Sequence, residues 1–198
     1  MAFIQKSKRT IRILDIGGTQ YFWYQLGLTN NSNLKITILN IKREKIVFNN
    51  ITHRLGSALN LGKFNDKEFD LVFSNSLLEH IANYEDQIKV AREIKRIGKT
   101  YIVQTPNKYF PIEPHYFLPF FYLVPRALRP YYITFFSLKW RASRRDFKEL
   151  GSHIGSIRLL KAKELENMFK GDEIVKEKFL FLTKSFVVYS KNLNFRKL

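Results

Sequence analysis

The chain has 198 residues, of which 45% are hydrophobic and none is cysteine, and its 34 Lys and Arg outnumber its 17 Asp and Glu to give a net charge of +17. This length and composition suit one domain with a buried core and exclude a chain that is disordered throughout. The lack of cysteine excludes disulfides, thiolate metal sites and cysteine nucleophiles, and it favours a reducing compartment. The positive charge favours acidic partners such as nucleic acid, anionic lipid or phosphorylated substrates.

No segment resembles a targeting signal or a membrane span. Residues 1–10 are basic but lack the apolar stretch of a signal peptide, and the apolar run 117–124 is short and interrupted by proline. The four histidines, His53, His80, His115 and His153, lie far apart in the sequence. We therefore expect a cytoplasmic protein without a transmembrane segment and without a metal site.

Short apolar or β-branched runs alternate with helical stretches along the first half of the chain. This alternation predicts an α/β fold with a parallel sheet. The five runs that predict strands are residues 11–14, 35–39, 50–55, 69–73 and 100–104.

One long helix stands out, because apolar residues recur at three- or four-residue spacing from 77 to 97 and Gly98 ends the pattern. Past Gly151 the pattern changes. A short helix over 162–169 precedes two runs, 173–180 and 184–190, which are close enough in the sequence to pair as an antiparallel hairpin.

Two predicted strands end abruptly in polar or glycine-rich turns. Residues 12–16 form an apolar run around Asp15 and are followed by Gly17, Gly18 and Thr19, while the run 69–73 leads into Ser74. In a parallel α/β sheet, ligands gather where the carboxyl ends of the strands meet. The sequence therefore predicts a nucleotide-like pocket at this edge.

Taken in order, the five alternating strands, the acid-glycine turn and the terminal hairpin resemble the class I S-adenosylmethionine-dependent methyltransferases, and in detail a subgroup related to the type 11 family. The resemblance covers nearly the whole chain and rests on residues 14–19, 38–40, 69–80, 107–115 and 180–185. It implies a Rossmann-like, doubly wound, mostly parallel sheet with an antiparallel C-terminal hairpin. It further implies a single domain over 1–198, with 106–150 as an aromatic and basic lid or insertion, and S-adenosylmethionine as cofactor.

The resemblance also implies which residues bind the cofactor at the first two strand ends. Asp15 would meet its amino group, directly or through water, Gly17 and Gly18 would pass beneath its methionine moiety, and Asn40 would bind its ribose hydroxyls. The alternatives are a turn-capping Asp, an ordinary tight turn and a helix N-cap. The chain departs from the family at Asn40, where an acid is usual, and at two of the three positions that are usually glycine, which favours modest affinity.

Further along the chain, Ser57, Ala58 and Leu59 would border the adenine, and Asn75 would lie where the sulfonium and the acceptor meet. A polar loop and a helix cap are the alternatives. Methyl transfer mainly needs alignment, and a base matters only when the acceptor must lose a proton. The base candidates are His115 and Glu113, after the fifth strand, and His80, each of which could instead have a structural role.

Aromatic residues and prolines crowd residues 116–140, and Arg and Lys follow them. This insertion suits either a lid packed on the sheet or a surface for anionic lipid at the inner face of the membrane. Our main hypothesis is a methyltransferase acting on an oxygen of a small-molecule, glycan or lipid-linked acceptor. The alternatives are an RNA-directed methyltransferase or nucleic-acid-binding protein, and a methyltransferase-like protein that has lost catalysis.

If His115 is the base, the substitution His115→Ala should abolish turnover and leave cofactor binding unchanged, because the imidazole would contact the acceptor and not the cofactor. A methyl-transfer assay and a calorimetric titration measure the two properties separately. Unchanged turnover would exclude His115 as the base.

Overall fold

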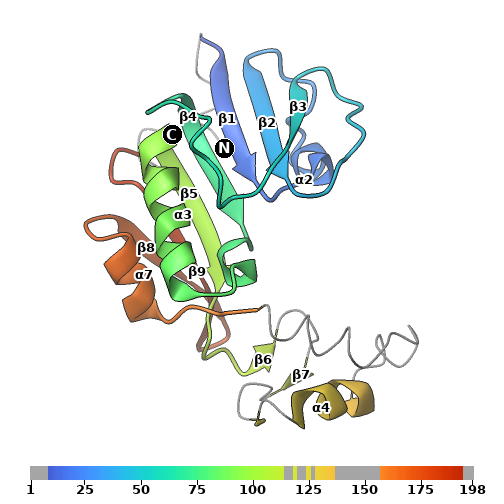
Figure 1. Cartoon of the computed structure of the whole chain (residues 1–198), viewed down its shortest axis with the longest axis vertical. Helices are drawn as coiled ribbons and strands as arrows, with labels where there is room; N and C mark the ends of the chain where they lie inside the picture. The colour runs from blue at the N-terminus through green and yellow to red at the C-terminus, as the bar shows by residue number, and fades with distance from the viewer. Residues whose placement is uncertain (1–8, 114–117, 120–123, 126–127, 137–156, 194–198) are drawn as a thin grey trace.

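The protein is described by a computed structural model covering residues 9–113, 118–119, 124–125, 128–136 and 157–193. Its centre is a seven-stranded sheet in the order β3-β2-β1-β4-β5-β9-β8 (Figure 1). The first five strands pair in parallel, whereas β9 pairs antiparallel with both β5 and β8. The predicted fold class is therefore confirmed. The strands are β1 (Ile11–Ile16), β2 (Leu34–Asn40), β3 (Ile51–Leu55), β4 (Phe69–Asn75), β5 (Gly98–Pro106), β8 (Glu173–Phe179) and β9 (Leu182–Tyr189).

The helix predicted over residues 77–97 is divided in the structure. A single 3-10 turn, η1 (Leu78–His80), is followed by an extended Ile81, and α3 (Tyr84–Ile97) begins only after Asn83. The side chain of Asn83 accepts a hydrogen bond from the Asp86 amide at 2.8 Å, which is the contact of a helix N-cap. The prediction was wrong here because hydrophobic spacing continues across this cap.

Helices α3 and α7 (Ala162–Met168) cover one face of the sheet over β4, β5, β9 and β8 (Figure 1). The apolar residues from Val90 to Ile97 of α3 are fully buried there, in one cluster with strand residues such as Val72 and Val103. Full burial of one such side chain contributes about 1.5–3 kcal/mol. This layer therefore anchors the half of the sheet that carries the C-terminal hairpin.

A second apolar cluster lies over the first half of the sheet. Helix α2 (Gln20–Gln25) buries Trp23 against strand residues that include Ile13, Ile36 and Ile38. Phe22, from the same helix, stacks on Phe73 of β4, with ring centroids 5.1 Å apart. The short helix that follows the glycine turn is thus held to the sheet by aromatic packing.

The region predicted as a lid, 106–150, is described in part. It contributes a two-stranded pair, β6 (Ile112–Glu113) and β7 (Leu118–Pro119), and the helix α4 (Arg129–Phe136). His115, most of 117–124 and most of the basic residues that follow lie outside the described residues, so the single domain with a lid stays a prediction. Among the helices that are described, none is long and apolar enough to cross a membrane.

Truncation of Ile94, which is fully buried on the sheet-facing side of α3, should lower the free energy of unfolding by about 3 kcal/mol, because Ile94→Ala leaves a cavity between the helix and the sheet. Urea denaturation followed by circular dichroism measures the loss. The exposed Arg92 on the same helix provides the control, and Arg92→Ala should change stability by less than about 0.5 kcal/mol. Equal losses in the two variants would contradict this packing.

Candidate functional site

The turn after β1 is shaped by two glycines that cannot be replaced without movement. Gly17 has φ +83°, and a Cβ there would lie 2.8 Å from Cδ1 of Leu77. At Gly18 a Cβ would lie 1.8 Å from Oδ2 of Asp15. Position 17 favours glycine because its backbone lies in the left-handed region, and position 18 favours it because a side chain there would clash with Asp15. The turn is a tight one, packed on a carboxylate and a leucine.

Asp15 is buried beneath this turn. Nε1 of Trp23 donates a hydrogen bond to Oδ2 at 2.7 Å, and Oδ1 has no hydrogen-bond partner among the described residues. Burial raises the pKa of the Asp15 carboxyl from its ordinary 3.8 to about 7, although the bond from Trp23 acts in the opposite direction. Near neutral pH this side chain is therefore about half ionised, and it supports the turn from within.

Asn40, at the end of β2, ties its strand to the same turn. Its Nδ2 donates to the carbonyl oxygens of Gly17 at 3.2 Å and Gly18 at 3.0 Å, and its Oδ1 accepts from the Lys42 amide at 3.1 Å. No helix follows Asn40, so the helix N-cap considered from the sequence is wrong. Among the described residues, Oδ1 of this half-buried amide accepts one hydrogen bond, which leaves its second lone pair for a ligand.

The loop after β3 lies beside the end of β2. The Gly56 amide donates to the carbonyl oxygen of Asn40 at 3.0 Å, and Oγ of Ser57 accepts from the Leu59 amide at 3.2 Å. Ala58 packs on the core, whereas the Leu59 side chain is 56% exposed. The loop therefore presents an apolar side chain next to the second strand end.

The end of β4 carries an exposed Asn75 followed by Ser76, whose φ of 52° lies in the left-handed region. Ser76 is held to β5 by two hydrogen bonds, from its amide to the carbonyl oxygen of Gln104 at 3.1 Å and from its Oγ to Oε1 of the same residue at 3.0 Å. Asn75 does not cap α3, because Asn83 does. Its side chain is thus available at the edge of the sheet.

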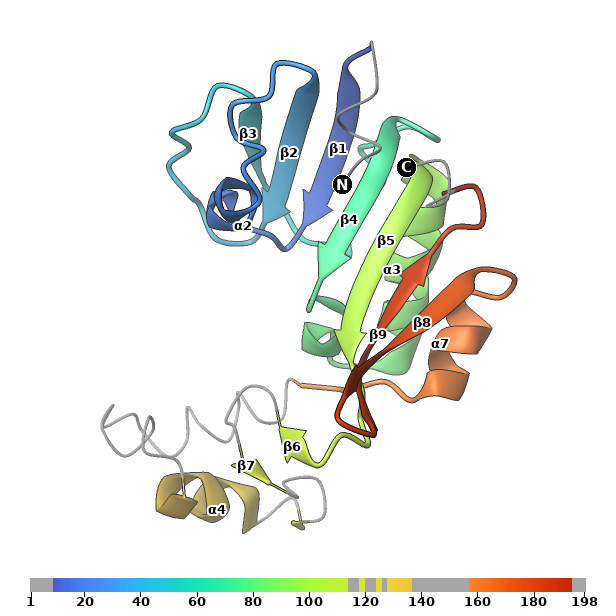
Figure 2. The ribbon, with the colours of Figure 1, turned by 180° about the vertical axis from the view of Figure 1, so that it is seen from behind.

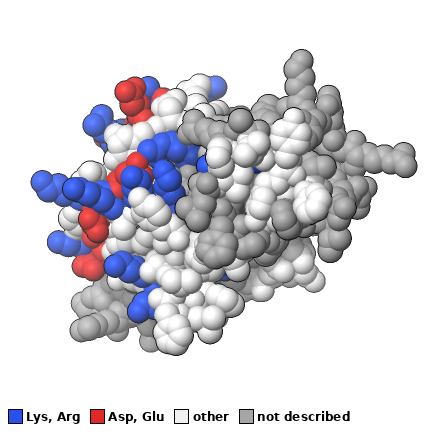
Figure 3. Space-filling view, turned by 90° about the horizontal axis from the view of Figure 1, so that it is seen from below, with Lys and Arg blue, Asp and Glu red and all other residues white. Residues whose placement is uncertain are grey.

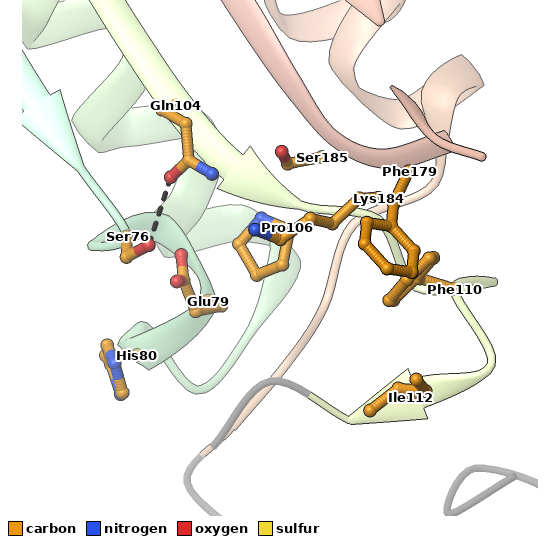
Figure 4. Close-up of a pocket in the computed structure, with 10 residues that line it drawn as sticks. All are labelled: Ser76, Glu79, His80, Gln104, Pro106, Phe110, Ile112, Phe179, Lys184 and Ser185. Atoms are coloured by element: carbon orange, nitrogen blue, oxygen red, sulfur yellow. Dashed lines mark hydrogen bonds between the residues drawn. The ribbon is translucent and has the colours of Figure 1, made fainter. Parts of the chain in front are cut away.

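A hollow of about 690 Å³ opens beside this edge (Figure 4). Glu79 is buried in its wall, where Oε2 accepts from Oγ1 of Thr105 at 3.1 Å, and His80 lies at the rim, exposed. At the other end the rings of Phe110 and Phe179 meet edge to face, 6.4 Å apart. The hollow is lined by Ser76, Glu79, His80, Gln104, Pro106, Phe110, Ile112, Phe179, Lys184 and Ser185.

Of the residues predicted to act, the structure brings Gly17, Gly18 and Asn40 into contact, and His80 lines the hollow. Glu113 lies in β6, and His115 is outside the described residues. Across the described ranges, no group of three or more potential ligand side chains could hold a metal ion.

Several residues of this edge were not predicted from the sequence. Gln104 and Lys184 owe their places to segments far apart in the chain, whereas Trp23 contacts Asp15, which lies eight residues before it. Lys184 lies within the segment 180–185 that carries the family resemblance, but nothing in the sequence assigned a role to it or to Gln104.

Comparison with known proteins finds a family match over part of the chain. Residues 19–100 match the sequence profile of a methyltransferase domain. Two uncharacterized proteins of Mycobacterium tuberculosis, from strains CDC 1551 and H37Rv, are each 35% identical over 57 residues, which are 29% of this chain and 20% of theirs. The chain thus matches about a fifth of the length of these relatives.

Solved structures share the fold. A SAM dependent methyltransferase from Archaeoglobus fulgidus matches with a TM-score of 0.56 and 13% identity, over 96% of this chain and 89% of that one. A SAM dependent methyltransferase from Aquifex aeolicus matches with a TM-score of 0.50 and 14% identity, over 96% of this chain and 86% of that one. A chain from Rhodobacter sphaeroides described as a Zn-dependent alcohol dehydrogenase matches with a TM-score of 0.58 and 11% identity, over 95% of this chain and 86% of that one. Such identities show the fold alone, and with the profile match they confirm the class I methyltransferase resemblance.

The pKa of Asp15 predicts a pH dependence of stability. Because the folded state binds this proton more tightly than the unfolded state, the free energy of unfolding should fall as pH rises from about 4 to about 7 and then level off. The variant Asp15→Asn lacks this charge, so it should be the more stable protein at pH 8 by on the order of 4 kcal/mol. Urea denaturation at pH 4, 6 and 8 measures the difference. Parallel profiles for the two proteins would contradict the assignment.

Proposed function

We propose that this class I methyltransferase domain binds S-adenosylmethionine at the carboxyl edge of its sheet and transfers the methyl group to an oxygen of a small-molecule, glycan or lipid-linked acceptor. One observation carries the proposal: the glycine turn, Asn40 and the 56–59 loop are joined by hydrogen bonds into one surface. The cofactor supplies an activated sulfonium methyl, so the protein needs chiefly to align it with the acceptor.

The residues of this surface fit such a cofactor. Gly17 and Gly18 are partly exposed and carry no side chain, so a ligand can approach their backbone closely. Asn40 offers the free lone pair of Oδ1 to a hydroxyl, and Leu59 offers an exposed apolar face for a planar ring. Asp15 fits a supporting position better than direct contact, because its carboxylate oxygens are fully buried.

Glu44 compensates in part for the missing acid at position 40. It follows β2 by four residues and is half-buried, and its Oε2 accepts from the amide of Gln20, the first residue of α2, at 3.2 Å. A carboxylate held next to the glycine turn is well placed to accept a hydrogen bond from a hydroxyl as well. We include Glu44 in the proposed cofactor site.

The hollow beside Ser76 is the proposed acceptor site. Its apolar residues, among them Pro106, Phe110 and Phe179, suit a hydrophobic portion of the acceptor. Lys184 has no ion pair among the described residues, so its ammonium suits an anionic group. An amphipathic acceptor with a negative charge would fit both the apolar residues and Lys184. His80 at the rim, with Glu113 and His115 from the loop after β5, are the proposed bases for a hydroxyl acceptor.

A calorimetric titration with S-adenosylmethionine and S-adenosylhomocysteine tests the cofactor site. The wild type should bind both, and Asn40→Ala should bind about tenfold more weakly, because it loses two hydrogen bonds that shape the turn.

The matched control is Asn50→Ala. Nδ2 of Asn50 also donates to two carbonyl oxygens, those of Leu28 and Asn31, but it precedes β3, at the opposite end of the sheet. Its loss should leave cofactor affinity unchanged. Equal weakening in the two variants would show a general effect on stability, and failure of the wild type to bind either ligand would overturn the proposed function.

A further inference from the structure

The tip of the β8–β9 hairpin carries four consecutive large apolar residues in contact with solvent. The exposed fractions are 56% for Phe179, 78% for Leu180, 93% for Phe181 and 51% for Leu182. Single exposed apolar side chains are common on protein surfaces, whereas a contiguous group marks a surface that contacts another apolar phase.

The tight turn at the hairpin tip favours glycine or other small residues, but this chain has bulky apolar residues there. Phe179 pairs with Leu182, so Leu180 and Phe181 form a two-residue loop, and Leu180 has φ 55°. Positive φ at the first loop residue is typical of hairpin turns that carry glycine there, and it strains a bulky residue. Leucine at this position therefore disfavours the hairpin locally, which indicates that its side chain is needed for something other than the turn.

A basic hollow of about 400 Å³ lies against the same hairpin. Three lysines line it, Lys161 and Lys163 from the start of α7 and Lys176 from β8, together with Tyr109 and Thr183. Within the described residues none of the three lysines has an ion pair. Nζ of Lys161 lies 5.9 Å from the centroid of the Tyr109 ring. Unpaired lysines around a hollow are suited to phosphate groups.

The tip projects past the end of β5, at the end of the molecule where β6, β7 and α4 also lie (Figure 2). Seen from this end, many of the described Lys and Arg side chains gather on one side of the molecule (Figure 3). The hairpin also borders the hollow beside Ser76, since Phe179 and Lys184 line that hollow. Apolar tip, basic hollow and proposed acceptor site are thus neighbours.

We propose that the β8–β9 hairpin tip, Phe179–Leu182, inserts into an anionic lipid interface while Lys161, Lys163 and Lys176 bind lipid phosphates. The side chains at the tip have no hydrogen-bonding groups, and the tip projects as a convex loop, so it suits a hydrocarbon phase better than nucleic acid. The lysines supply the charge complementarity with an anionic headgroup layer. The contact was expected from the sequence at residues 116–140, and the hairpin offers a second, described surface for it.

Sedimentation with vesicles of phosphatidylcholine alone, or with 30% phosphatidylglycerol, tests the surface without any cofactor or acceptor. The wild type should bind the anionic vesicles at low salt and be released by high salt. The double variant Leu180→Gly, Phe181→Asn should bind at least about tenfold more weakly, because two inserting side chains are lost. It should stay folded, since glycine suits the turn, and its thermal unfolding checks this.

Two further variants separate the parts of the surface. Replacement of Lys161, Lys163 and Lys176 by Gln should remove most of the salt-dependent binding. Val47→Asn removes a side chain that is 67% exposed on a distant loop, and it should bind like the wild type. In Phe181→Trp the indole emission should shift to the blue on addition of anionic vesicles. Unchanged vesicle binding by the tip variant would overturn the proposal, as would tighter binding of a single-stranded RNA than of vesicles.

Discussion

The turn after β1 depends on one buried carboxylate. Asp15 occupies the space that a side chain at position 18 would need, and it is held there by Trp23 of the helix that follows. The contact joins the strand, the turn and the helix, and the Asn40 amide then joins the second strand to the same turn. Because a buried carboxylate is costly when ionised, its raised pKa is the physical consequence of this arrangement.

The departures from the usual glycine pattern have a local explanation. Trp23 and Phe22 fix α2 to the sheet by aromatic packing, and Tyr21 between the turn and these residues is 62% exposed. The helix therefore begins close to the strand without a third glycine. Asn40 uses both amide hydrogens to hold the turn, and the Glu44 carboxylate accepts from the amide of Gln20 at the start of α2.

The C-terminal hairpin links the two halves of the proposed activity. β9 pairs antiparallel with β5, so the hairpin tip extends past the carboxyl end of that strand. One side of the hairpin borders the proposed acceptor hollow and another borders the three lysines. An acceptor with an apolar portion and an anionic group, held at a lipid interface, would reach the hollow without crossing open water.

The features that could be predicted from the sequence are those that depend on local interactions. Strand positions were predicted to within about two residues, because apolar runs bounded by polar turns report burial directly. The long helix was predicted too far toward its N-terminus, since spacing does not register that Asn83 caps it. The glycine turn was recognised, because an acid and two glycines after a strand form a local pattern.

What the tertiary structure decided depends on segments that are distant in the chain. Parallel pairing of β1 with β2 brings Asn40 to the glycine turn, and pairing of β4 with β5 brings Gln104 to Ser76. In the sequence the residues of the hairpin tip resemble ordinary strand residues, because hydrophobicity does not show which apolar side chains become buried in the core. The sequence by itself determined the fold class and the acid-glycine turn, whereas only the folded chain decided which polar groups meet and which apolar ones remain in water.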